Sequence, residues 1–153
     1  MFGKRVSQYL GFQKVFLGLI AAVGLARLGL SLAGLPNTTV MWLSMNVVAW
    51  AGALYYGVAV HTRGFGSYKQ LLPLGFFQTV LMQSIAVLGI LLSIAGLQNI
   101  FAAPEYSFGA HSQWFHILAH LTVGILVPPL LVWGVASLVL LITKRVARRP
   151  AVA

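Results

Sequence analysis

Three of the chain's four histidines and its only acidic residue lie within one short stretch of sequence. His116 and His120 are four residues apart, so their rings share one face of a helix, and two imidazoles at this spacing can bind one metal ion. Glu105 and His111 precede them and complete a possible set of three or four ligands. The residues between His116 and His120 include no Glu, which excludes the H-E-x-x-H pattern of zinc proteases. The alternative is a pair of histidines that only hydrogen-bond across a helix bundle.

Haem is the second cofactor that these histidines would allow. Bis-histidine ligation needs imidazoles at similar depth on facing helices. The only histidine on another predicted helix is His61, which we place at the opposite end of the chain's apolar blocks. A haem site would therefore need a second copy of the chain or a partner subunit.

Other catalytic constellations are missing from the sequence. A single acidic residue excludes catalysis by paired carboxylates, and the absence of cysteine excludes thiolate chemistry and disulfides. The chain has no G-x-S-x-G motif, no P-loop and no Asp. We therefore expect a non-enzymatic protein that binds a hydrophobic or lipid-like ligand, or an accessory subunit of a larger membrane complex. The alternative is a metal- or haem-binding redox or hydrolytic membrane enzyme built on the outer histidines.

The composition predicts an integral membrane protein. Of 153 residues, 59% are apolar and only 7% are charged, and the mean hydropathy is +0.92. A soluble domain of this size carries about 25% charged residues. Eleven charged side chains cannot cover the surface of a soluble monomer, and the length allows one transmembrane domain over residues 1–153.

Four apolar blocks are long enough to cross a bilayer as helices, which takes about 20 residues. Their continuity excludes transmembrane strands, whose apolar residues alternate. The sequence therefore predicts an all-α antiparallel bundle of four transmembrane helices. The expected spans are residues 15–35, 40–60, 71–97 and 115–142, with an outer loop over 98–111 and a cytoplasmic tail over 144–153.

The basic residues orient this bundle. Nine of the ten flank the expected spans on one side, and Arg27 is the exception. Because Lys and Arg concentrate in cytoplasmic segments, both termini are predicted to be cytoplasmic, in a plasma or inner membrane. The net charge of +9 then faces anionic lipid headgroups rather than nucleic acid.

Small residues and prolines predict how the helices pack. Close approach of helices in lipid uses small side chains at i, i+4 spacing, so we expect the first span to bury the stripe Gly18, Ala22, Ala26, Gly29 and Ala33. Pro128 and Pro129 should kink the fourth span and free carbonyl groups that a neighbouring side chain must satisfy. Gln83 is the expected partner. The chain could also pack against further copies of itself or against other subunits of a larger complex.

Three polar side chains fall at similar depth in the expected outer leaflet. At a rise of about 1.5 Å per residue, Arg27 lies roughly 12 Å, Asn46 roughly 9 Å and His120 roughly 8 Å from the outer ends of their spans. Intramembrane ionisable residues mark functional sites by default. We therefore expect Arg27, Asn46 and His120 to line a ligand pocket, with Glu105, His111 and His116 at its rim. Alternatively, Arg27 reaches the interface or pairs with Glu105.

Overall fold

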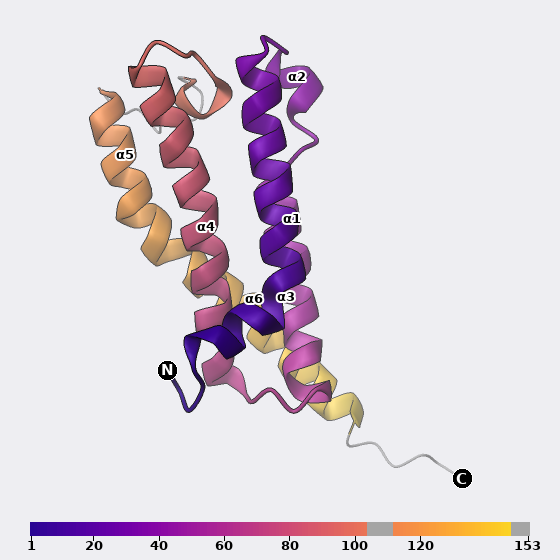
Figure 1. The fold of residues 1–153 in the computed structure, drawn as a ribbon. Coiled ribbons are helices and arrows are strands. Elements are labelled where there is room, and N and C mark those ends of the chain that lie inside the picture. Colours follow the sequence, from indigo (N-terminus) through magenta and orange to yellow (C-terminus); the bar gives the residue numbers. More distant parts are fainter. Residues whose placement is uncertain (104–111, 148–153) are drawn as a thin grey trace.

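The computed structural model describes residues 1–103 and 112–147, and these residues contain helices and connecting segments but no strand. Four helical segments are long and apolar enough to cross a membrane, as the sequence predicted. They alternate in direction, so the start of the first and the end of the last lie at the same end of the bundle (Figure 1). We call this the terminal end and the other the far end.

The first helix, α1, spans Val6–Leu32, and its start is fixed by reciprocal hydrogen bonds between Arg5 and Gln8. It begins well before residue 15 and ends before residue 35, so Lys14 lies inside the helix with an exposed side chain rather than ahead of it. Gly34, which has a φ of +85°, follows the end of the helix. A positive φ is unfavourable for other residues, and Gly34 thus marks where α1 stops.

The second expected span consists of two helices. A single turn, α2 (Asn37–Val40), is followed by α3 (Met45–Thr62). The oxygen of Ser44 accepts a hydrogen bond from the backbone N–H of Val47 and caps α3. Ser is favoured at this position because its side chain satisfies an N–H group that has no intrahelical partner. The long helix therefore begins five residues later than predicted.

The third and fourth spans also differ from the expected bounds. Helix α4 covers Tyr68–Ile94 and is followed by a short 3-10 helix, η1 (Ile100–Ala102). The fourth span is divided at Thr122 into α5 (Gln113–Leu121) and α6 (Val123–Ala147). We expected the irregularity at Pro128 and Pro129, but it falls almost two turns earlier.

Two apolar clusters hold the bundle together. The cluster nearer the terminal end joins all four long helices, with Tyr9 from α1, Tyr56 from α3, Leu74 from α4 and Leu140 from α6 among its buried members. The smaller cluster consists of Ile20, Met45, Ala49 and Ile85. Glycines allow this packing, because a Cβ atom on Gly57 would lie 2.7 Å from the carbonyl oxygen of Ala136 in α6.

The packing face of α1 is not the predicted one. Its buried residues are Tyr9, Gln13, Ile20, Gly24 and Leu28. The stripe from Gly18 to Ala33 lies on the exposed side, and a Cβ atom on Gly18 or Gly29 would meet nothing within 4 Å. The prediction failed because α1 is apolar all round, so small size alone did not identify the buried face.

Candidate functional site

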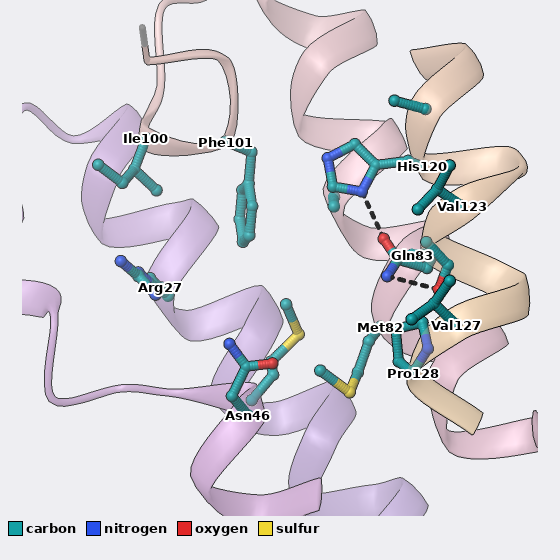
Figure 2. Close-up of a pocket in the computed structure, with 14 residues that line it drawn as sticks. Arg27, Asn46, Met82, Gln83, Ile100, Phe101, His120, Val123, Val127 and Pro128 are labelled. Carbon is teal, nitrogen blue, oxygen red and sulfur yellow. Dashed lines mark hydrogen bonds between the residues drawn. The ribbon is translucent and has the colours of Figure 1, made fainter. Parts of the chain in front are cut away.

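A cavity of about 530 Å³ lies in the half of the bundle toward the far end. Every helix except the single turn α2 contributes to its lining. Arg27, Asn46 and His120 all line this one cavity, from α1, α3 and α5. Figure 2 shows Arg27 and Asn46 on one wall and His120 with Gln83 on the opposite wall. The ten other lining residues are apolar or glycine: Met45, Met82, Ala86, Ile100, Phe101, Ala119, Val123, Gly124, Val127 and Pro128.

On the wall formed by α4, α5 and α6, the carbonyl group of Gly124 lacks the N–H donor that a regular helix would supply. Pro128 has no N–H, so it cannot bond to the carbonyl of Gly124 four residues earlier. The side-chain nitrogen of Gln83 donates to this carbonyl at 3.1 Å. This confirms the predicted pairing of Gln83 with a proline-freed carbonyl. Gly124 lets the amide approach, because a Cβ atom there would lie 2.9 Å from the side-chain carbon Cδ of Gln83.

The hydrogen bond from Gln83 to Gly124 determines which ring nitrogens of His120 and His116 carry a proton. Because the Gln83 nitrogen faces a carbonyl, its oxygen Oε1 faces the Nδ1 atom of His120 and accepts the proton of that nitrogen. A neutral His120 then has a lone pair on Nε2. The Nε2 atom of His116 lies 3.0 Å from it and is the donor of this contact. Both ring nitrogens of His120 and both ends of Gln83 are therefore engaged within the protein.

The opposite wall carries the polar side chains of Arg27 and Asn46. Arg27 is half-buried, and its Nη2 atom donates to the side-chain oxygen of Asn37 at 3.0 Å. Asn37 begins α2, so this contact ties the turn to α1. Asn46, in the first turn of α3, is exposed, and its amide makes no hydrogen bond within the described residues.

A short segment after α4 closes the cavity toward the far end. Asn99 donates to the carbonyl of Gly89 at 2.7 Å and accepts from the N–H of Phe101 at 3.1 Å. The N–H of Ile100 donates to the hydroxyl of Ser31 in α1 at 2.8 Å. These bonds fix η1 between α1 and α4, with Ile100 and Phe101 against the cavity. Sequence reasoning missed both residues, although Asn99 before an apolar triplet resembles a helix start.

At the end of the cavity nearer the terminal end, α1 packs closely against α3 and α4. Met45 and Met82 line the cavity there. A Cβ atom on Gly24 would lie 2.4 Å from the sulfur of Met45 and 2.9 Å from Cδ1 of Ile85. A side chain at position 24 would displace the ends of Met45 and Ile85, so Gly24 allows the observed packing of this apolar layer beneath the cavity.

The predicted metal ligands are only partly described. Glu105 and His111 lie outside the described residues, so their place near Arg27 or the histidines stays a prediction. His116 is buried, and its Nε2 atom bonds to the lone pair of His120 that a metal would need. Among residues 1–103 and 112–147, no group of three or more His, Cys, Asp or Glu side chains gathers. His116 and His120 thus form a hydrogen-bonded pair in this structure.

Comparisons of the chain with protein-family models, with curated proteins and with solved structures gave no match.

Proposed function

We propose that this chain is a membrane protein that binds a hydrophobic or lipid-like ligand in the cavity, without catalysis. The observation that carries the proposal is the cavity itself. Its volume of about 530 Å³ falls in the range of small-molecule sites, which are mostly apolar with a few polar groups. The polar groups here come from separate helices, whereas the rest of the lining is aliphatic, aromatic or thioether.

The proposed orientation places the terminal end in the cytoplasm. Lys4 and Arg5 precede α1, Arg63 and Lys69 border the turn between α3 and α4, and Lys144 and Arg145 end α6. All these positions are at the terminal end. With the positive-inside rule, the cavity then belongs to the outer leaflet of a plasma or inner membrane. Anionic headgroups on the cytoplasmic side are the expected lipid partners.

The two walls suggest how such a ligand lies. Its polar head bonds to Asn46, whose exposed amide makes no hydrogen bond within the described residues, and lies beside the positive charge of Arg27. Its apolar body follows Val123 and Val127, which line the cavity and are 61% and 45% exposed. Exposure of cavity-lining valines gives an apolar molecule a lateral path from the lipid.

Binding of a fluorescent long-chain fatty acid to the protein in nanodiscs tests this function. We expect saturable binding that Asn46→Leu and Arg27→Leu each weaken by about tenfold, since one lost hydrogen bond to a charged or polar head is worth about 1.4 kcal/mol. Arg63→Leu, at the terminal end, is the matched control and should leave the affinity unchanged. Fluorescence that rises linearly with probe, equally in empty nanodiscs, would refute the proposed function.

The histidine pair favours the competing function, a metal- or haem-binding membrane enzyme. The Nε2 atoms of His116 and His120 are 3.0 Å apart and share a hydrogen bond. A metal ion bound by both rings would have to replace that hydrogen bond. Metal analysis and a visible absorption spectrum of the purified protein separate the two functions. A Soret band, or one zinc or copper ion per chain that is lost in His116→Ala, would favour the metal- or haem-binding enzyme over the non-enzymatic proposal.

An accessory role in a larger complex is favoured by the exposed side of α1. Gly18 and Gly29 have open space where a Cβ atom would point, and small residues on helix surfaces allow other transmembrane helices to approach. Gly18→Leu should then reduce association with a second copy or a partner subunit. Size-exclusion chromatography in mild detergent measures this, with Leu19→Ala, a neighbouring exposed position, as the control.

A further inference from the structure

A fully buried amide in α1 is left without a partner. Gln13 is 0% exposed, and neither its side-chain oxygen nor its nitrogen makes a hydrogen bond. Buried side-chain amides in proteins almost always have a hydrogen-bond partner, either a protein group or an ordered water. The surroundings of Gln13 therefore need to supply one.

The helices that face Gln13 bring a second amide and a hydroxyl to the same level. Phe12 and Phe16, which flank Gln13 in α1, contact the ring of Tyr56 in α3 with centroids 6.1 and 5.5 Å apart. Gln78 in α4 lies beside Phe16, because a Cβ atom on Gly52 would be 3.2 Å from Phe16 and 2.4 Å from the Gln78 nitrogen. Because Phe12 and Phe16 lie on either side of Gln13 along α1, Gln13 is at the level where Tyr56 of α3 and Gln78 of α4 meet.

Only one of the two polar atoms of the Gln78 side chain has a hydrogen-bond partner. Its nitrogen donates to the hydroxyl of Tyr56 at 3.1 Å, whereas its oxygen is buried and has no partner. The Tyr56 hydroxyl accepts this bond and keeps its own hydrogen to donate. Together with the Gln13 amide, the three side chains offer both donors and acceptors, and none of them is charged.

We propose that Gln13, Gln78 and Tyr56 enclose a binding site for a small uncharged molecule that both donates and accepts hydrogen bonds, namely water. A buried water makes about three hydrogen bonds to groups that are otherwise unsatisfied, and this cluster offers that number. The lack of a charged side chain in the cluster disfavours an ion, because a buried ion needs an opposite charge. The bound water links α1 to α3 and α4 in the half of the bundle toward the terminal end.

This water site is separate from the ligand cavity. On α1, Ile20 lies between Gln13 and the cavity residue Arg27, and on α3, Ala49 lies between Tyr56 and Asn46. Both belong to the smaller apolar cluster, whose Met45 borders the cavity. The proposal of ligand binding in the cavity and the proposal of a bound water at Gln13 can therefore be tested independently.

Nuclear magnetic resonance of the full chain in nanodiscs, with isotope-labelled glutamine, tests the proposal. The Gln13 side-chain amide, assigned by its loss in Gln13→Leu, should show a cross-peak to a long-lived water. The side-chain amide of Asn99, labelled in the same way, is the control and should show none, because its nitrogen donates to Gly89 and Leu97 and its oxygen accepts from Phe101. Cross-peaks from Gln13 to Gln78 or to lipid chains without one to water would overturn the proposal.

A double-mutant cycle gives a second readout that does not depend on spectral assignment. Gln13→Leu and Gln78→Leu each remove one partner of the shared water, so the second substitution should have little left to remove. We expect the unfolding constant of the double variant to be at least about fivefold below the product of the two single effects. Additive effects would show that the two amides share no guest and would overturn the site.

Discussion

Replacing Gln83 tests how α6 is held against α4. Gln83→Leu removes the donor to the Gly124 carbonyl and the acceptor for His120 Nδ1, and neither group has a helical partner to replace it. Side-chain hydrogen bonds between transmembrane helices contribute about 0.6 kcal/mol on average and up to about 1.7 kcal/mol. Two such bonds predict a loss of about 1–3 kcal/mol in the free energy of unfolding.

The background variant Pro128→Ala isolates one of these bonds. Alanine restores an N–H at position 128, which can bond to the Gly124 carbonyl as in a regular helix. In this background, Gln83→Leu should cost about 0.5–1.5 kcal/mol less than in the natural chain, because only the His120 contact is then lost.

Reversible unfolding in mixed micelles, followed by the fluorescence of the four tryptophans, measures both effects. Ser84→Ala is the matched control, since Ser84 is exposed and bonds only to the carbonyl of Val80 in its own helix. Equal losses from Gln83→Leu in the two backgrounds would refute the reasoning, because the amide would then not be satisfying the proline-freed carbonyl.

Three further outcomes can be measured on the same chain. Gly57→Ala should destabilise the protein by about 1–3 kcal/mol, because its Cβ atom would lie 2.7 Å from the Ala136 carbonyl, whereas Gly18→Ala should change the midpoint of unfolding little. On this cysteine-free chain, Ser107→Cys should react with an impermeant thiol reagent only from outside and Ser7→Cys only from the cytoplasm, and the reverse pattern would overturn the orientation. Asn99→Leu should loosen η1 and weaken fatty-acid binding, which Gln98→Ala, an exposed neighbour, should do much less; equal effects would mean that η1 does not shape the cavity.

The sequence alone determined the number of long helices and one specific contact between them. Length and continuity of apolar runs identify spans because a helix that crosses a bilayer needs about 20 such residues. The pairing of Gln83 with a carbonyl freed by Pro128 was also predictable, since proline always removes the same donor. Depth counting also grouped Arg27, Asn46 and His120, because an α-helix rises about 1.5 Å per residue, although the count for Asn46 crossed the break between α2 and α3.

Only the tertiary structure decided which faces meet. On α1 every face is apolar, so the pattern did not reveal that Tyr9, Gln13 and Ile20 are buried while Gly18 is exposed. The contact between Arg27 and Asn37 depends on α2 being a separate turn folded beside α1. The closing of the cavity by Phe101 likewise depends on Asn99 reaching back to Gly89. These features arise from contacts between segments distant along the chain, and local residue patterns carry no information about such contacts.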